Sequence, residues 1–437
     1  MKKARVLTLV LILCMIFTAL CPAALADSAP NISAKNAIVI EQASGTVLYE
    51  KSADAKAAPA STTKIMTLLL TCEAIERGEV SCDDEIYANA EDIYIIDSDA
   101  SNAGIAPGEV LTLRDLCYCA MLASANEATN LIASHVAGSV SAFVEMMNDK
   151  AEELGCENTH FVNTNGLPNE EHYTTARELA VIAQEAMKHT FFRELCATAE
   201  YTVPETNVAE PRKLNNSNAL INPKSYYGKE YFTENAYGIK TGHTEAAGYC
   251  LVSAIREGNL DLLCVVLGAT GDGKEGKYFN NFADTLKLVD YCKENFHCTT
   301  VLSADEVLGK IPVEKGRQKA LPLSPACDVS MLLPDDTKLE SFERTLTLNY
   351  EAVPAPVKKG AIIGSVDVTN ADGELLCSCE LVAAKDVNAS VIDYVLANAG
   401  SFVSENIAVL SVIVLILVAA VFAVVYIPHV KKGKDKK

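Results

Sequence analysis

The sequence is short of positive charge. Among its 437 residues, 37 Lys and Arg residues stand against 57 Asp and Glu residues, and the formal net charge is −20 at pH 7. An acidic chain repels nucleic acid phosphates, so non-specific binding to nucleic acid is excluded. The sequence also has no Cys-x-x-Cys pair and no Cys/His cluster with the spacing typical of metal ligands. We therefore expect neither a nucleic acid partner nor a bound metal.

The 15 cysteines do not form a pattern typical of a disulfide scaffold. Two of them belong to an N-terminal leader, and the remaining 13 are an odd number. Several lie inside apolar runs, namely Cys117, Cys119, Cys250 and Cys264. In such positions a thiol behaves as a small core side chain. We expect most of the thiols to be free.

The N-terminus has the features of a secretory signal peptide. Lys2, Lys3 and Arg5 give a positive start, and an apolar run follows from Val6 to Leu20. Ala24-Leu25-Ala26 supplies the small residues of a cleavage site, so we expect removal of residues 1–26. The alternative is an uncleaved N-terminal anchor.

The C-terminus predicts a membrane anchor. Ile407 to Ile427 is an uncharged run of 21 residues, long enough to cross a hydrocarbon core of about 30 Å. The basic tail at 428–437 predicts a cytoplasmic end, with the body of the chain outside. Residues 386–406 carry apolar side chains with helical spacing and predict an amphipathic segment at the membrane surface. The alternative for 407–427 is a buried core helix.

The order of the expected elements indicates an α/β (α+β) catalytic domain at 27–298. Strands are expected at Asn36 to Glu41 and Thr46 to Glu50, and again at Tyr249 to Ile255 and Leu260 to Leu267. Helical periodicity fills most of the segment between them. This order predicts an antiparallel sheet flanked by helices, with a helical lobe inserted into it. Residues 299–385 alternate short β-type stretches with Pro and Gly, which predicts a small β-rich domain.

The first motif with chemical meaning is Ser61-Thr62-Thr63-Lys64, at the start of an apolar helix. Residues three apart share a helix face, which places the Lys64 amine beside the Ser61 hydroxyl. A serine becomes a good nucleophile when a base removes its proton, and a lysine of lowered pKa can do so. The alternative is an N-cap serine and a solvated lysine.

Two further motifs follow in order, Ser124-Ala125-Asn126 and Lys240-Thr241-Gly242. Each is common by chance, as another Ser-x-Asn at Ser404 beside the apolar C-terminal run illustrates. The first is expected after a helix of the lobe and the second on a strand. Together with the serine-lysine pair they form the combination found in serine β-lactamases and penicillin-binding proteins.

From about Ala34 to Lys385 the sequence resembles the low-molecular-mass penicillin-binding proteins, the serine D-alanyl-D-alanine carboxypeptidases. The stretches His160 to Leu167 and His172 to Arg177 are similar to a further characteristic region of that family. The resemblance implies a β-lactamase/transpeptidase-like fold followed by a small β-rich domain, with no organic cofactor. It implies peptidoglycan stem peptides as substrates and β-lactam antibiotics as covalent inhibitors. The enzyme would be secreted and anchored to the bacterial cytoplasmic membrane. A full C-terminal span departs from the many members that use an amphipathic helix alone.

Carried over to this sequence, the resemblance implies three catalytic residues. Ser61 would be the nucleophile, Lys64 its general base, and Ser124 a proton relay to the departing D-alanine. Five residues would bind the substrate: Asn126 its amide, Lys240 and Thr241 its carboxylate, Gly242 through close backbone approach, and His243 through its N–H in an oxyanion hole with that of Ser61.

Three other functions remain open from the sequence. A serine β-lactamase of class A needs an additional glutamate, and residues 160–167 contain none. A non-enzymatic wall-binding protein would be expected to lose the serine or the lysine. A transpeptidase differs only in the acceptor of the acyl group. We expect His160 and His172 to be structural, and Glu127 to be a helix-start residue.

Overall fold

The chain divides into two units, Met1–His297 and Cys298–Lys437. The structure is a computed structural model that describes residues 29–94, 100–272, 278–335, 337–392 and 403–434. The predicted signal peptide at 1–26 lies outside these residues.

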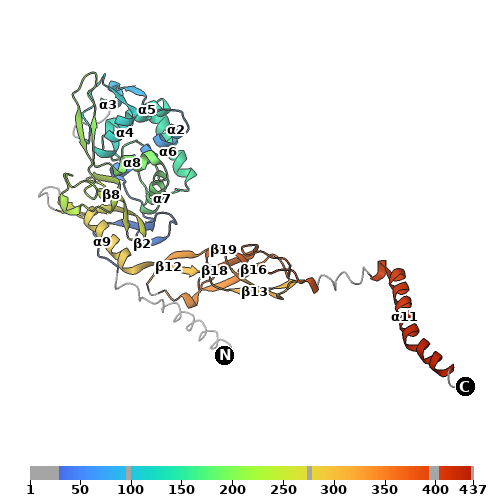
Figure 1. The fold of residues 1–437 in the computed structure, drawn as a ribbon. Coiled ribbons are helices and arrows are strands. Elements are labelled where there is room, and N and C mark those ends of the chain that lie inside the picture. Colours follow the sequence, from blue (N-terminus) through green and yellow to red (C-terminus); the bar gives the residue numbers. More distant parts are fainter. Residues whose placement is uncertain (1–28, 95–99, 273–277, 336, 393–402, 435–437) are drawn as a thin grey trace, which may run out of the picture. The chain divides into compact units, whose positions relative to one another are not determined.

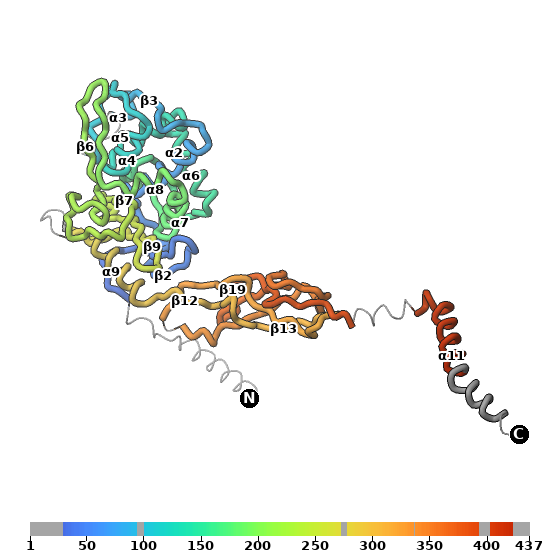
Figure 2. The backbone as a smooth tube through the Cα atoms, viewed as in Figure 1, coloured from blue at the N-terminus to red at the C-terminus, as the bar shows by residue number. Residues whose placement is uncertain are grey.

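A five-stranded antiparallel sheet forms the centre of the first unit, in the order β2-β1-β9-β8-β7. Its strands are β1 (Asn36–Glu41), β2 (Val47–Lys51), β7 (Ala236–Thr244), β8 (Gly248–Glu257) and β9 (Leu260–Ala269). Strand β1 pairs with β9 from Asn36 opposite Leu267 to Glu41 opposite Leu262. The first and last strands of the sheet in sequence therefore lie side by side (Figure 2). The predicted hairpin at the N-terminus is confirmed.

Helices cover both faces of this sheet, which explains why β9 is apolar along almost its whole length. Leu263 and Val265 belong to the large core shared with the helical lobe. Cys264, between them, lies against Thr285 of α9 (Asn280–Asn295). Helix α9 packs on β8 and β9, while α7 (Ala176–Ala186) packs on β1 and β9, and α8 (Thr190–Ala197) packs on β7.

The helical lobe lies between β2 and β7 in the sequence (Figure 1). Its main elements are η1 (Ala60–Thr63), α2 (Lys64–Glu76), α4 (Leu113–Leu122), α5 (Asn126–Ala137) and α6 (Val140–Glu153). Helix α2 is buried on every side from Lys64 to Cys72, as expected for a helix surrounded by others. The helical character predicted for the segment between the two groups of strands is confirmed.

Several short elements were not predicted. They are α3 (Ala90–Tyr94), the hairpin of β3 (Glu85–Tyr87) with β4 (Val110–Thr112), the hairpin of β5 (Glu200–Val203) with β6 (Arg212–Asn215), η2 (Lys229–Tyr231), and β10 (Gly271–Asp272) with β11 (Tyr278–Phe279). Strands of two to four residues are too short for a clear alternation of polar and apolar side chains.

The second unit is the predicted small β-rich domain. Its six-stranded sheet has the order β16-β18-β19-β14-β13-β17, and β12 pairs separately with β15. The strands are β12 (Phe296–Leu302), β13 (Gly309–Glu314), β14 (Ala320–Pro325), β15 (Val329–Pro334), β16 (Glu343–Leu348), β17 (Val353–Pro354), β18 (Ile362–Thr369) and β19 (Leu375–Ala383), with a 3₁₀ turn η3 (Leu339–Ser341). Alternate residues such as Ile311, Val313, Leu321 and Leu323 form its core.

A C-terminal helix, α11 (Ile407–Lys434), follows, with side chains described as far as Phe422. Among the residues that the structure describes, no helix is both long and apolar enough to cross a membrane. The span predicted at 407–427 is therefore not confirmed. Much of the predicted amphipathic segment at 386–406 falls on residues 393–402, outside the described residues.

Candidate active site

Ser61 lies in the 3₁₀ turn η1, directly before α2. Lys64 is the first residue of α2, and its Nζ lies 2.9 Å from Ser61 Oγ. In a 3₁₀ turn residues three apart are nearly eclipsed, so the two side chains meet. The cap position of α2 belongs to Thr63, whose side chain makes no capping bond. The alternative of a capping serine and a solvated lysine is therefore wrong, and Lys64 is fully buried.

The Lys64 amine has three hydrogen-bond partners. Besides Ser61 Oγ it contacts Asn126 Oδ1 at 2.7 Å and the backbone oxygen of Asn165 at 2.9 Å. The last two atoms can only accept hydrogen bonds. A neutral amine has two protons and one lone pair, so donation to these two oxygens directs the lone pair at Ser61. The geometry is that of a base positioned to take the serine proton.

Burial also favours the neutral form of this amine. Desolvation lowers the pKa of Lys64 well below its usual value, and the charge of Lys240 lowers it further. The carboxylate of Glu127 acts in the opposite direction. Neutral lysine is the form that can accept a proton, so the site favours general-base chemistry.

The second motif joins α4 to α5. Ser124 lies in this connection with a left-handed backbone (φ 57°), is only 8% exposed, and its side chain makes no hydrogen bond to any described residue. Asn126 begins α5, and because its Oδ1 accepts from Lys64, its Nδ2 remains to donate to a ligand. Glu127 lies in the first turn of α5, as predicted, where its buried carboxylate accepts from the Ala103 N–H at 2.7 Å.

The third motif lies on β7, as predicted. Lys240 is 1% exposed, donates to the Thr241 carbonyl at 3.1 Å, and has its pKa lowered to about 7 by burial. The Thr241 hydroxyl lies 2.7 Å from the hydroxyl of Ser217. The Ser217 N–H donates to the carbonyl of Leu122, the last residue of α4. Ser217 was not predicted, and it connects the third motif to the loop that carries the second.

Gly242 allows β7 to pass directly against the turn that carries the serine. A Cβ atom there would lie 3.0 Å from the Ser61 nitrogen and 3.1 Å from the Pro59 oxygen. Gly242 was predicted to allow a substrate to approach the strand closely. In the structure its lack of a side chain is already required by the packing of β7 against the turn with Ser61. The next residue, His243, is exposed and stacks its ring on Tyr249 at 4.1 Å between centroids. Its ring makes no contact with Ser61 or Lys64 that would suggest proton transfer.

The loop that supplies the Asn165 carbonyl is fixed by a glycine. Gly166 has φ 90°, and a Cβ atom on it would lie 1.8 Å from the Ala60 oxygen. His172 holds the same region together: its Nδ1 accepts from the Val162 N–H at 3.1 Å, so its Nε2–H donates to the Thr63 hydroxyl at 2.8 Å. Burial lowers the pKa of His172 to about 4, so the ring is neutral and structural.

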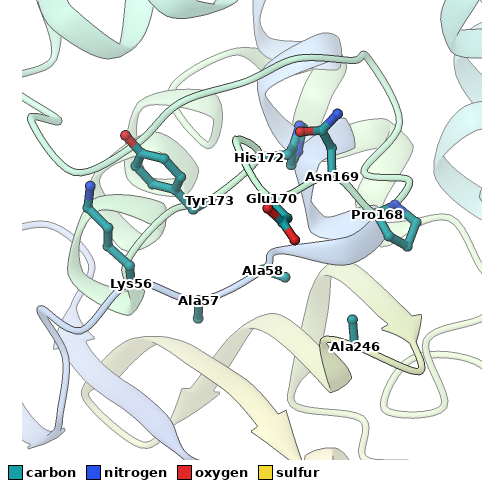
Figure 3. A pocket seen from close by; sticks show the side chains of 9 residues that line it. All are labelled: Lys56, Ala57, Ala58, Pro168, Asn169, Glu170, His172, Tyr173 and Ala246. Atoms are coloured by element: carbon teal, nitrogen blue, oxygen red, sulfur yellow. The ribbon is translucent and has the colours of Figure 1, made fainter.

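A pocket of about 630 Å³ lies beside the serine turn. Its walls are Lys56, Ala57, Ala58, Pro168, Asn169, Glu170, His172, Tyr173 and Ala246. The side chain of Glu170 points into the space above Ala58 (Figure 3). The Lys56 amine lies 3.9 Å from the centre of the Tyr173 ring. Ala246 is the second residue after β7, so the pocket lies beyond the end of that strand. Within the described ranges, no group of three or more His, Cys, Asp or Glu residues could hold a metal ion.

The fold and the serine-lysine site place the chain among proteins of the penicillin-binding class. Penicillin-binding protein 5 of Haemophilus influenzae superimposes with a TM-score of 0.61 at 26% identity, over 82% of this chain and 99% of that one. The family model "D-alanyl-D-alanine carboxypeptidase" matches residues 23–271. The model "Penicillin-binding protein 5, C-terminal domain" matches residues 296–389. The chain belongs to the D-alanyl-D-alanine carboxypeptidase family, peptidase S11, and the predicted membership of this enzyme family is confirmed.

Individual relatives are consistent with this assignment. The D-alanyl-D-alanine carboxypeptidase DacF of Bacillus subtilis is 31% identical over 354 residues, covering 81% of this chain and 86% of the relative. The D-alanyl-D-alanine carboxypeptidase of Streptomyces sp. strain K15 is 33% identical over 258 residues, 56% of this chain and 84% of the relative. A solved variant of the Streptomyces K15 DD-transpeptidase has a TM-score of 0.53 at 30% identity, over 60% of this chain and 98% of that one.

Proposed function

We propose that this protein is a serine D-alanyl-D-alanine carboxypeptidase that removes the terminal D-alanine from peptidoglycan pentapeptide stems. The observation that carries the proposal is the set of contacts of the buried Lys64 amine. Two of its three partners are oxygens that can only accept a hydrogen bond, so the third, the Ser61 hydroxyl, is the partner from which the amine can take a proton. The names of the relatives support the choice of substrate.

In the proposed acylation step, Lys64 takes the proton of Ser61 as the serine oxygen attacks the carbonyl between the two D-alanines. Positioned general-base help typically contributes 10²- to 10⁴-fold to the rate. The N–H groups of Ser61 and His243 stabilise the oxyanion that forms, where removal of one donor costs about 3 kcal/mol. The position of Gly242 against Ser61 supports this arrangement because it brings β7 to the nucleophile.

The leaving group receives its proton through Ser124, with Lys240 keeping positive charge nearby. Thr241, held by Ser217, and the charge of Lys240 bind the terminal carboxylate. The Asn126 Nδ2 donates to an amide carbonyl of the substrate, which adds along β7 as an extended strand. Water then hydrolyses the ester of Ser61 and releases the shortened stem.

The stem residue that precedes the two D-alanines is proposed to occupy the pocket in Figure 3. Going along β7 from Thr241, which binds the carboxylate, past His243 leads to Ala246 in the pocket wall. An extended peptide bound through its carboxylate would follow the same direction.

Mass spectrometry of the purified protein with benzylpenicillin, followed by a D-alanine release assay on diacetyl-Lys-D-Ala-D-Ala, tests this function. We expect a penicilloyl adduct that persists for minutes and D-alanine release by the wild type. A β-lactamase would clear the adduct within seconds and ignore the peptide, and a non-enzymatic wall-binding protein would form no adduct. Absence of both adduct and D-alanine would refute the proposal.

Transpeptidation is a second candidate because one structural relative is described as a DD-transpeptidase. The two activities share the acyl-enzyme and differ in whether water or an amine accepts the acyl group. Adding glycylglycine to the peptide assay separates them. A carboxypeptidase gives the hydrolysed product throughout, whereas a transpeptidase gives a growing share of the longer peptide.

We also propose that the enzyme acts outside the cytoplasmic membrane and is held there by its C-terminus. The support is the leader predicted at 1–26, the uncharged run at 407–427 and the basic tail at 428–437. The catalytic domain would be residues 27–298, followed by the β-rich domain at 299–385 and the amphipathic segment at 386–406. A chain ending at Val387 should be soluble and active, and its retention in the membrane fraction after leader cleavage would contradict this topology.

A further inference from the structure

Two cysteines of the second unit face each other across neighbouring strands. Cys327 Sγ and Cys379 Sγ are 4.0 Å apart. Strand β14 ends at Pro325, which pairs with Leu381 of β19, and the Ala326 N–H still donates to the Glu380 carbonyl at 2.8 Å. Continuing this antiparallel register by one residue places Cys327 opposite Cys379.

This register suits a disulfide. Directly opposed residues of an antiparallel pair have Cβ atoms about 4.5–5.5 Å apart. A disulfide needs Cβ atoms roughly 3.5–4.5 Å apart and Cα atoms within about 7 Å. Side-chain rotation with a small closing of the strands therefore brings the sulfur atoms to bonding distance. The strand pairing that orients the two side chains exists without the bond.

The two thiols also differ in access in a way that sets an order of reaction. Cys327 is exposed, whereas Cys379 is 9% exposed at the edge of the core. A soluble disulfide can reach Cys327 first, and Cys379 is positioned to react second. Cys377 lies two residues earlier on β19, on the same face as Cys379, but opposite Val368 of β18. It provides a matched control.

We propose that Cys327 and Cys379 form a reversible cross-strand disulfide when the protein meets an external low-molecular-mass disulfide. The Cys327 thiolate attacks the external disulfide, forming a mixed disulfide and releasing one thiolate. The Cys379 thiolate then attacks the Cys327 sulfur and releases the second. The two protein thiols are oxidised, the external disulfide is reduced to two thiols, and the protons of Cys327 and Cys379 pass to them.

The bond would act as a structural lock on the second unit and does not depend on the proposed activity. It closes a loop that contains β15, β16, β17 and β18, and so restricts the unfolded chain. The contact with Cys379 and the nearby carboxylates of Asp328 and Glu380 raise the pKa of Cys327. Its thiolate fraction at neutral pH is therefore small, which makes formation slow and distinguishes this pair from a catalytic redox centre.

The test uses the purified full chain, incubated with oxidised glutathione, blocked with iodoacetamide in denaturant and digested with trypsin without reductant. We expect a disulfide-linked peptide joining the segment with Cys327 to the segment with Cys379. The linked peptide should persist in Cys377→Ser and disappear in Cys327→Ser, an exposed substitution that leaves the core intact. The oxidised wild type should unfold in its second unit roughly 10 °C higher than the reduced form, and Cys327→Ser should show no such difference.

Three outcomes would overturn the proposal. One is the absence of a linked peptide at every glutathione ratio. Another is the loss of the linked peptide in Cys377→Ser, which would show that Cys327 bonds to Cys377 instead of Cys379. The third is its persistence in Cys327→Ser. Each can occur while D-alanine release by the wild type stays normal, so the proposed function is judged separately.

Discussion

The amine of Lys64 and the hydroxyl of Ser61 are 2.9 Å apart, and the lysine side chain is fully buried. Its other two partners are oxygens that can only accept. A charged Lys64 would satisfy all three contacts by donation, while a neutral one must accept from Ser61. The protonation state of one amine thus decides whether the serine is activated, and this leads to the first prediction.

Ser61→Ala should abolish covalent labelling by benzylpenicillin, because no acyl acceptor remains. Lys64→Ala should slow labelling by about 10²- to 10⁴-fold, because the serine loses its general base. Second-order labelling rates by mass spectrometry measure both effects. Lys188→Ala serves as the control: this exposed lysine pairs with Glu185 on the surface and should leave penicillin labelling unchanged. Near-normal labelling of a folded Lys64→Ala would contradict the assigned role.

Ser217→Ala should weaken recognition of the substrate's carboxylate. The substitution removes the hydroxyl that lies 2.7 Å from that of Thr241 and so releases its orientation. One hydrogen bond of about 1 kcal/mol corresponds to roughly fivefold slower acylation by benzylpenicillin. The methyl ester of benzylpenicillin should be affected less. An equal loss with both ligands would indicate a packing effect instead.

The acylation rate should depend on pH with a maximum. On the acid side the rate rises as Lys64 loses its proton, at a pH well below the usual lysine value because burial lowers its pKa. On the alkaline side it falls as Lys240, with a pKa lowered to about 7, loses the charge that binds the carboxylate. Stopped-flow labelling across pH measures both limbs. The ester of benzylpenicillin should lose the alkaline limb, and a rate that falls equally for both ligands would argue against Lys240 as the cause.

Stability should fall on acidification partly because of His172. Its pKa is lowered to about 4 in the folded protein, so the unfolded state binds the proton first as the pH falls below 6.5. The contribution is complete above pH 6.5 and is lost toward pH 4, amounting to roughly 3 kcal/mol. Urea unfolding of wild type and His172→Asn at several pH values measures it. The variant should be less stable at neutral pH but lose less stability on acidification.

The sequence predicted the site better than it predicted the contacts that complete it. Ser61, Lys64, Asn126 and Thr241 could be found because side-chain type and order carry their chemistry. The Asn165 oxygen could not, because any residue supplies a backbone carbonyl and only the loop geometry places it. Gly166, next to Asn165, lies in the stretch from His160 to Leu167 that resembles the family. A glycine is required there because a Cβ atom would clash with the Ala60 oxygen, a contact that no local pattern reveals.

The fold was predictable where periodicity was long. The strands at both ends of the first unit and the long helices between them have clear patterns, whereas the three-residue strands β3 and β4 do not. Ser217 illustrates the remaining gap. It lies in an irregular segment after β6, and only tertiary structure brings it to Thr241.

The pairing of β1 with β9 has a consequence for the assembly of the enzyme. The strand at 36–41 pairs with its neighbour β2 along one edge, but its other edge finds a partner only when residues 260–269 are present, so the full sheet depends on contacts very distant in sequence. Such topologies fold slowly, since a large loop must close, at a cost in chain entropy, before the strand pairing stabilises the fold. A chain released gradually from its N-terminus would expose Ser61 long before Lys240 and Gly242 arrive beside it. On the proposed mechanism, acyl transfer begins only after nearly the whole first unit has emerged, which protects the growing chain from premature reaction with its substrate.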